Sequence, residues 1–233
     1  MAIDRFSIHV QAVLRIFDSF SYMPVKKSYL RFYCDSNVKI LPKEDGYFVA
    51  VGNESSGIIH IESTFYKDIS VDISNANPNI PLNLWAEPKS GYNMAENILW
   101  IETAAEPGEK LYAFEYKTEP VLRLLEDSRE NDLSLKIYQE RKMFLNGADM
   151  LIYTKDDLNS AEIVKVEDIE NERCTLLCPL KNEHKKIKTG LYKLATATSD
   201  DLGKCSIAVA KHEDKTKYII FNSNGEKIDE ITI

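Results

Sequence analysis

Hydrophobic residues recur at every second position along the first part of the chain. Between residues 7 and 17, one side of the pattern carries Ile8, Val10, Ala12, Leu14 and Ile16. Successive side chains of a strand leave on opposite faces, so a period of two predicts a half-buried β-strand. Similar short runs follow up to Trp85, separated by turn signals such as Asp45-Gly46, which suits a tight hairpin. Residues 1–90 therefore predict a seven-stranded antiparallel β-sandwich.

The second part of the chain shows the same periodicity less regularly. Strand patterns occupy residues 98–102, 111–116 and 133–138, and they return from residue 149 to the end. Residues 120–126 fit either a short helix or a strand, and the clear alternation just beyond them favours a strand. Pro88 and Gly91 mark a boundary between the two parts. The sequence predicts an all-β protein with a sandwich at 1–90 and a second β-rich, barrel-like domain at 91–233.

Composition and charge narrow the class of partner. The chain has 233 residues, 44% of them hydrophobic and 28% charged, which is typical of globular proteins. Its formal charge of −8 divides into −1 for residues 1–90 (nine Lys and Arg, ten Asp and Glu) and −7 for residues 91–233 (twenty against twenty-seven). An acidic surface repels phosphate backbones, so we expect no nucleic-acid partner.

The sequence also bears on location. No apolar run approaches the roughly 20 residues of a membrane-spanning helix, so no membrane partner is expected. The first residues lack the basic and apolar segments of a secretory signal. We therefore expect a cytoplasmic protein, which could also be incorporated into an exported particle.

Four residues have the side-chain types of a structural zinc site: Cys174, Cys178, His184 and Cys205. Cys174 and Cys178 lie in a predicted strand, where four residues span roughly 13 Å. Two thiolates on one zinc ion, each at ~2.3 Å, cannot be so far apart. We expect the two sulfurs to lie on the inward face with Leu176, and we expect no metal or other cofactor.

Catalytic motifs are not found in the sequence. It contains no Gly-x-Ser-x-Gly elbow, no His-Glu-x-x-His helix and no glycine-rich phosphate loop. His60 alternates with Ile59 and Ile61, which places it on the solvent face of a strand. Adjacent carboxylates such as Asp200-Asp201 lie in expected loops. These observations predict a protein that is not an enzyme.

Aromatic residues supply the candidate interaction surface. Trp85, Tyr92 and Trp100 bracket the predicted domain boundary. They either pack the two domains together or form an anchor surface for a protein or a sugar, because aromatic side chains bury large areas at such contacts.

Residues 7–87 resemble the prealbumin-like sandwich of carboxypeptidase regulatory-like domains. The resemblance depends on Ile16-Phe17-Asp18-Ser19-Phe20-Ser21-Tyr22-Met23-Pro24, on Lys43-Glu44-Asp45-Gly46-Tyr47-Phe48, and on Ser63-Thr64-Phe65-Tyr66. A Ser-Tyr pair stands where many members carry Thr-Gly, which puts that turn in doubt. The resemblance implies a fold and no activity.

A second resemblance covers about forty residues of the other part. Gly147-Ala148-Asp149-Met150-Leu151-Ile152, then Asn159 to Val166, then Leu177-Cys178-Pro179-Leu180 and His184 are similar to small β-barrels of phage tails and contractile injection particles. This implies a structural or interaction protein whose partners are other proteins of a multi-subunit assembly. The alternative is a carbohydrate-binding module that uses Trp85, Tyr92 or Trp100.

Overall fold

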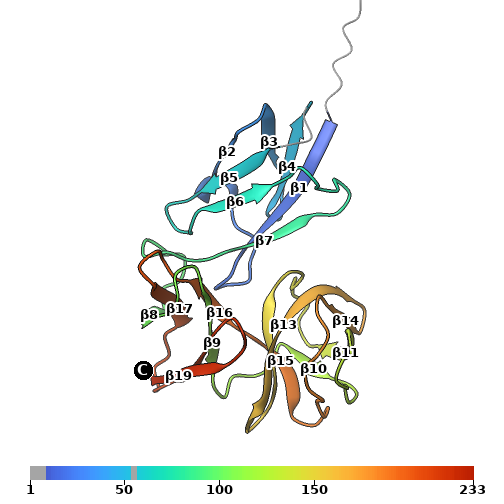
Figure 1. The fold of residues 1–233 in the computed structure, drawn as a ribbon, viewed down its shortest axis with the longest axis vertical. Coiled ribbons are helices and arrows are strands. Elements are labelled where there is room, and N and C mark those ends of the chain that lie inside the picture. Colours follow the sequence, from blue (N-terminus) through green and yellow to red (C-terminus); the bar gives the residue numbers. More distant parts are fainter. Residues whose placement is uncertain (1–8, 54–56) are drawn as a thin grey trace, which may run out of the picture. The chain divides into compact units, whose positions relative to one another are not determined.

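The computed structural model describes residues 9–53 and 57–233, and nearly all of its regular structure is β-strand (Figure 1). The expected all-β class is confirmed. The chain divides into two compact units, Met1–Met94 and Ala95–Ile233, compared with the predicted boundary at residue 90. The described residues include no helix with the length and apolar content needed to cross a membrane.

Residues 9–53 and 57–94 of the first unit form seven strands in two sheets. One sheet has the order β3-β4-β1-β7 and the other the order β2-β5-β6. The strands are β1 (His9–Asp18), β2 (Arg31–Cys34), β3 (Val38–Pro42), β4 (Tyr47–Gly52), β5 (Ile58–Glu62), β6 (Ile69–Asp72) and β7 (Leu82–Ala86), and a short 3-10 turn η1 covers Lys27–Tyr29. Residues 7 and 8 of the first predicted strand lie outside the described residues.

Alternation along β1 builds the core of this unit. Ala12, Leu14 and Ile16 are fully buried, whereas Gln11 and Arg15 are only partly buried. At the β3–β4 hairpin, Asp45 and Gly46 both have positive φ, at 54° and 73°. A Cβ on Gly46 would lie 2.9 Å from the Ile16 carbonyl oxygen, so the turn requires glycine there.

One strand pair departs from the expected antiparallel sandwich. β7 runs parallel to β1, with Leu14 opposite Leu82 and Phe17 opposite Trp85, while the other pairs of this unit are antiparallel. After β6, which belongs to the other sheet, the chain crosses over and forms β7 beside β1. A parallel pair needs such a long crossover, and alternation within each strand carries no information about strand direction.

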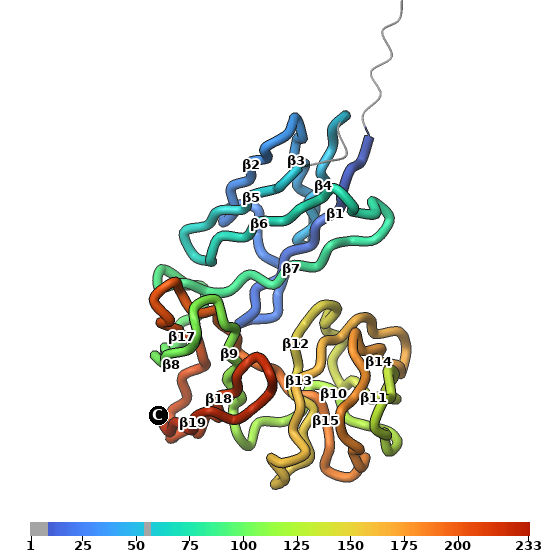
Figure 2. Tube along the Cα trace, in the orientation of Figure 1, coloured from blue at the N-terminus to red at the C-terminus, as the bar shows by residue number. Residues whose placement is uncertain are grey.

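In the second unit, a barrel is inserted in the sequence between the strands of another β structure. The part that is outer in the sequence consists of β8 (Ile98–Ala104), β9 (Lys110–Glu115), β16 (Ala195–Thr198), β17 (Lys204–Ala210), β18 (Lys217–Phe221) and β19 (Lys227–Thr232). Between β9 and β16 the chain forms β10 (Leu122–Leu124), β11 (Ser134–Gln139), β12 (Asp149–Thr154), β13 (Asp157–Glu170), β14 (Arg173–Leu176) and β15 (Thr189–Lys193). Figure 2 shows the chain passing from β9 through these strands and back to β18 beside β9.

Those six inner strands close into a barrel in the order β10-β11-β14-β13-β12-β15. Residues 120–126, whose sequence fits either a short helix or a strand, contain strand β10. β10 pairs with β11 on one side and with β15 on the other, so it completes the closed ring. Closure leaves no open sheet edge within the barrel.

The sheet β16-β9-β18-β19 packs on both faces. Leu111, Ala113 and Ile220 lie on one face with Ile101 and Ile207 of the β8–β17 pair. The other face meets the outside of the barrel, where the rings of Phe114, Tyr153 and Tyr192 form edge-to-face pairs at 5.3–5.6 Å. Such pairs stabilise a core beyond the area that they bury.

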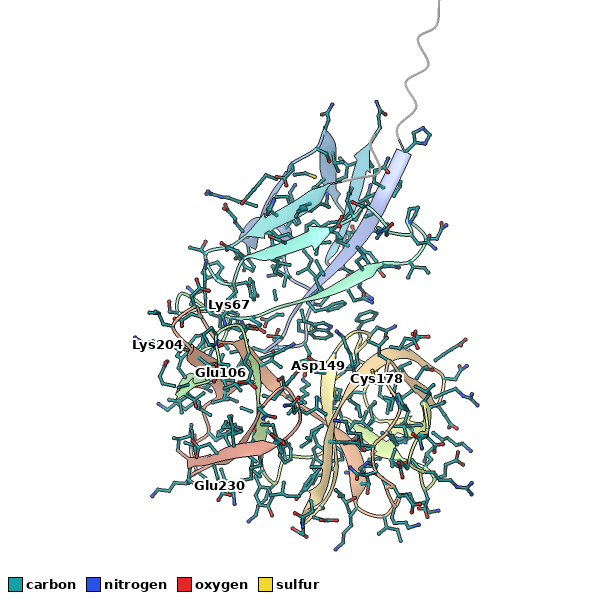
Figure 3. The ribbon with its side chains drawn as sticks, in the orientation of Figure 1. Lys67, Glu106, Asp149, Cys178, Lys204 and Glu230 are labelled. Atoms are coloured by element: carbon teal, nitrogen blue, oxygen red, sulfur yellow. The ribbon has the colours of Figure 1, made fainter. Side chains whose placement is uncertain are left out.

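A polar contact accompanies this apolar junction. Lys110 Nζ of β9 lies 2.8 Å from Oδ2 of Asp149. Asp149, which is labelled in Figure 3, is the first residue of β12. The Tyr112 hydroxyl lies 3.4 Å from the same oxygen. The two parts of the second unit are therefore joined by both aromatic and charged contacts.

Candidate functional site

A buried polar cluster lies at one end of the barrel. Glu162 is opposite Ile152 in the β12–β13 ladder. Because Leu151 and Ile163 of these strands pack outward against the neighbouring sheet, the alternate residues Ile152 and Glu162 face the barrel interior. Glu162 is thus a carboxylate among buried side chains of the barrel.

Loop residues between β14 and β15 supply its hydrogen bonds. The backbone N–H groups of Lys181 and Asn182 donate to Glu162 Oε2 and Oε1, at 2.8 Å and 3.1 Å. His184 Nε2 lies 2.9 Å from Glu162 Oε1, and the imidazole is 1% exposed. We call Glu162, His184 and Ser128 the barrel-end latch, because they hold this loop on the barrel.

Ser128 completes the latch through the backbone. Ser128 and His184 exchange two backbone hydrogen bonds, of 2.9 Å and 3.1 Å, as a directly opposed antiparallel pair. Their side chains therefore leave the same face. Ser128 Oγ and His184 Nδ1 are both buried and have no hydrogen-bond partner in the described part of the chain.

The electrostatics of Glu162 follow from these contacts. Burial acts to raise the pKa of Glu162, but hydrogen bonds from His184 and from the Lys181 and Asn182 amides outweigh it, so this pKa lies below its usual 4.5. Ser, His and Glu are side-chain types that serve acid–base catalysis, yet Ser128 and Glu162 are only 6% and 5% exposed. The contacts that Glu162 makes hold the loop between β14 and β15 against the barrel.

The outside of the barrel is different in character. On β10, β11 and β14 and their ends, the outward positions include three exposed apolar side chains and three cations: Leu125, Tyr138 and Leu177, with Arg123, Lys136 and Arg173. We call these six residues the outer barrel face. Tyr138 is 51% exposed and Leu177 is 55% exposed, so large apolar groups lie open to solvent here.

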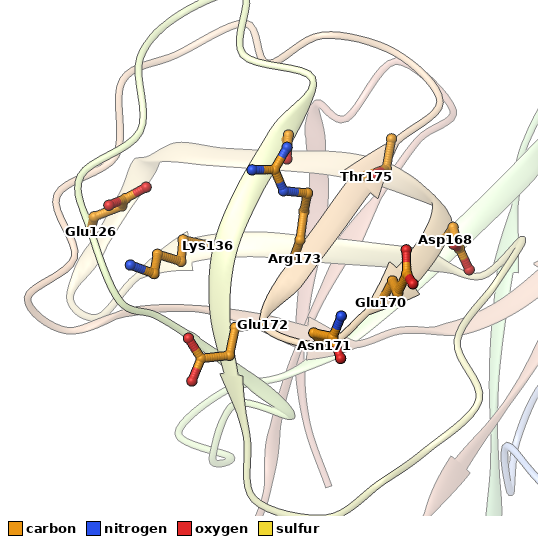
Figure 4. A pocket seen from close by; sticks show the side chains of 9 residues that line it. Glu126, Lys136, Asp168, Glu170, Asn171, Glu172, Arg173 and Thr175 are labelled. Atoms are coloured by element: carbon orange, nitrogen blue, oxygen red, sulfur yellow. The ribbon is translucent and has the colours of Figure 1, made fainter.

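Two cations of this face lie side by side. Lys136 and Arg173 are directly opposed in the β11–β14 ladder. Neither makes an ion pair within residues 9–53 and 57–233, whereas Arg123 pairs with Glu119 at 2.7 Å. Figure 4 shows Lys136 and Arg173 on the barrel surface, with acidic side chains on their flanks. Like charges directly opposed destabilise a strand pair, so this pairing is locally unfavourable.

Two shallow depressions adjoin the outer barrel face. One, of about 580 Å³, contains Lys136 and Arg173. The other, of about 650 Å³, is lined by Tyr138 and Phe144 and by polar groups that include Asn146. Asp168, Asn171 and Glu172, at the β13–β14 turn, line both.

The first unit has a buried carboxylate of its own. Asp18 Oδ1 accepts the backbone N–H groups of Phe20 and Ser21, at 2.8 Å and 3.3 Å. Its Oδ2 accepts the hydroxyls of Tyr66 at 3.2 Å and Tyr92 at 2.5 Å. Burial raises the pKa of both tyrosines, and Asp18 adds to the increase. Asp18 is therefore a structural hub of this unit.

Of the three candidate aromatic residues, Trp85 and Tyr92 belong to the first unit and Trp100 belongs to the second. Trp85 is partly buried and stacks on Phe17 at a centroid distance of 5.1 Å. Tyr92 is 5% exposed and its hydroxyl binds Asp18, so its ring offers no open surface. Trp100 is partly buried in β8 of the second unit. Tyr92 therefore packs within the first unit, and the interaction surface formed by these three residues stays a prediction.

The cysteines also differ from expectation in one respect. Cys174 is buried with Leu176, and burial raises the pKa of its thiol to about 12. Cys178 is exposed, because β14 ends at Leu176 and the alternation that would place both sulfurs inward stops there. Cys205 is buried beside the Ala197 carbonyl. The described residues contain no His, Cys, Asp and Glu group that could hold a metal ion.

Sequence reasoning missed the barrel-end latch and the outer barrel face. The sequence pattern does not place His184 beside Glu162, and Glu162 occupies a position in an alternating strand that its polarity would not predict as buried. The cations of the outer barrel face alternate with apolar residues, which is the ordinary pattern of a half-exposed strand. The pairing of β10 with β11 and of β11 with β14 brings them onto one surface.

Comparison of the chain with protein-family models and with curated protein sequences finds no match.

Proposed function

We propose that this chain is a non-enzymatic structural or interaction protein that works as a component of a larger protein assembly, of the phage-tail or contractile-injection type. The outer barrel face is the observation that carries the proposal. It combines exposed apolar residues on a closed barrel with two cations, Lys136 and Arg173, that form no ion pair among the described residues. Interfaces between proteins are enriched in aromatic residues and arginine, and this surface has both.

The internal organisation of the chain supports the same proposal. Its buried carboxylates, Asp18 and Glu162, use their oxygens to bind backbone amides and neighbouring side chains. These groups hold loops in place. The sequence resemblances to a prealbumin-like accessory module and to phage-tail barrels point to the same class of protein. A rigid β scaffold with surface recognition is typical of such components.

The proposal is tested by sedimentation of the tagged chain in extract of its native host. We expect wild-type protein to sediment in a particle much larger than the 26.6 kDa chain. Tyr138→Ala and Leu177→Asp should release it from the particle. Tyr33→Ala, at a tyrosine of the first unit that is 50% exposed, is the matched control and should stay in the particle. Wild-type protein that sediments alone would overturn the proposal.

A carbohydrate-binding module is the second candidate, and the 650 Å³ depression beside Tyr138 favours it. An exposed tyrosine next to amide and carboxylate side chains, here Asn146, Asp168 and Asn171, can stack on a sugar ring and bind its hydroxyls. A glycan array distinguishes the two candidates. Sugar binding by the wild type that is lost in Tyr138→Ala and kept in Tyr33→Ala would support the carbohydrate-binding module. The absence of binding to any glycan would exclude it.

A further inference from the structure

Strand β8 is paired along only one of its edges. Its seven residues form a regular antiparallel ladder with β17, from Ile98 opposite Ala210 to Ala104 opposite Lys204, with no bulge. No other strand in the described part of the chain pairs with β8. The second edge is therefore open along the whole length of the strand.

The backbone groups at this open edge can be assigned. Just beyond the two ends of the ladder, Ala105 N–H donates to the Gly203 carbonyl and Lys211 N–H donates to the Asn97 carbonyl. Hydrogen-bonded pairs recur at every second residue of an antiparallel ladder. The odd-numbered residues of β8 consequently bond to β17, whereas the N–H and C=O groups of Ile98, Trp100, Glu102 and Ala104 point to the open edge.

β8 also lacks the features that protect other edges of this protein. β19 carries Lys227, Asp229 and Glu230 and has a bulge, and β3 is short and ends at Pro42. β8 begins with four apolar residues, Ile98 to Ile101, and contains neither lysine nor proline. Long, regular and apolar edges of this kind pair readily with another strand.

We propose that this edge pairs antiparallel with the same edge of a second copy of the chain, with Ile101 at the two-fold axis. Residue numbers in opposed pairs then add to 202, so Ile98 lies opposite Ala104 and Trp100 opposite Glu102 of the other copy. Each open N–H and C=O group of β8 finds a partner. The result is a continuous four-stranded sheet, β17-β8-β8-β17, across an isologous interface.

Charge and strand length favour this register over its neighbours. Centring the pair on Glu102 would place two Glu102 carboxylates opposite each other, which is unfavourable. Centring it on Trp100 would leave Ala104 opposite residue 96, outside the strand. With Ile101 at the axis, Trp100 lies near the middle of the interface, where tryptophan contributes most to binding. This interface involves none of the outer barrel face, so it stands independently of the proposed function.

Sedimentation equilibrium of the full chain over a range of concentrations tests the inference. We expect reversible dimerisation of the wild type and of Glu102→Ala, which keeps the backbone N–H. Glu102→Pro removes an open-edge N–H and keeps the backbone hydrogen bonds to β17; like Glu102→Ala, it also loses the hydrogen bond from Ser206. Two intermolecular hydrogen bonds are then lost per dimer, which should raise the dissociation constant by about tenfold or more. Glu230→Pro, on the open edge of β19, is the matched control and should dimerise like the wild type.

Amide hydrogen exchange gives a second readout that does not depend on substitution. Exchange at Ile98, Trp100, Glu102 and Ala104 should slow as the protein concentration rises. A wild type that stays monomeric up to its solubility limit would overturn the inference, as would a Glu102→Pro variant that dimerises with unchanged affinity. Protection of these amides only inside a larger particle would assign the edge to a different partner and would also refute pairing with a second copy.

Discussion

Replacing Glu162 by alanine tests the barrel-end latch most directly. The substitution leaves three donors without an acceptor: His184 Nε2–H and the backbone N–H groups of Lys181 and Asn182. An unsatisfied buried donor costs about 1–3 kcal/mol. Because Lys181 and Asn182 are exposed residues whose amides can reach water, we expect a loss of about 3 kcal/mol in the free energy of unfolding.

Two further variants separate the latch from a general effect of substitution in β13. Glu162→Gln keeps one acceptor oxygen, so it should cost less than Glu162→Ala, about 1–2 kcal/mol. Glu167→Ala, at an exposed position of the same strand, should change the free energy of unfolding by less than about 0.5 kcal/mol.

Urea unfolding followed by tryptophan fluorescence measures these differences. Trp85 belongs to the first unit and Trp100 to the second, so a Trp85→Phe background leaves one reporter in the unit that contains the barrel. The reasoning would be refuted if Glu162→Ala lost no more than about 1 kcal/mol, or if it could not be distinguished from Glu167→Ala.

Three other outcomes follow from the same contacts. The pKa of Glu162 in the folded protein lies below 4.5, so its stabilising contribution is complete above pH 4.5 and disappears as the pH falls through the lowered value. The stability difference between wild type and Glu162→Gln should therefore shrink in acid. A constant difference would contradict this. Asp18→Ala leaves four hydrogen-bond donors without an acceptor, so it should destabilise the first unit by about 3 kcal/mol, measured by urea unfolding with Trp85 fluorescence as the signal. Asp18→Asn should cost less. In the native protein, iodoacetamide should label Cys178 and leave the buried Cys174, with its thiol pKa of about 12, unmodified; mass spectrometry of the labelled peptides would expose an error in either assignment.

Local pattern predicted the fold class well because strands of a half-buried sheet alternate. The burial of Ala12, Leu14 and Ile16 follows the sequence pattern, and the Asp45-Gly46 turn has the positive φ values that its residues favour. The turn between β18 and β19 contains Asn224-Gly225, a pair that favours a two-residue turn with positive φ at both residues. Only Gly225 has positive φ, and a bulge follows in the β18–β19 ladder, so the turn is of a different type.

Sequence pattern was less informative where a residue's role depends on distant segments. Tyr92 reads as an aromatic residue at a boundary, yet its hydroxyl binds Asp18, 74 residues away in the chain. The strand ending at Leu176 set the different environments of Cys174 and Cys178, and alternation could not predict where that strand would stop.

By itself the sequence determined that this chain forms β-strands, roughly where they lie, and which face of most of them is buried, because these properties depend on neighbouring residues. Tertiary structure alone decided that β7 runs parallel to β1, that a closed barrel lies between β9 and β16, and that Glu162 meets His184 inside it. Each of these depends on which strands pair and in which direction. Pairing partners are chosen by the packing of the whole unit, and a period of two is the same for every strand.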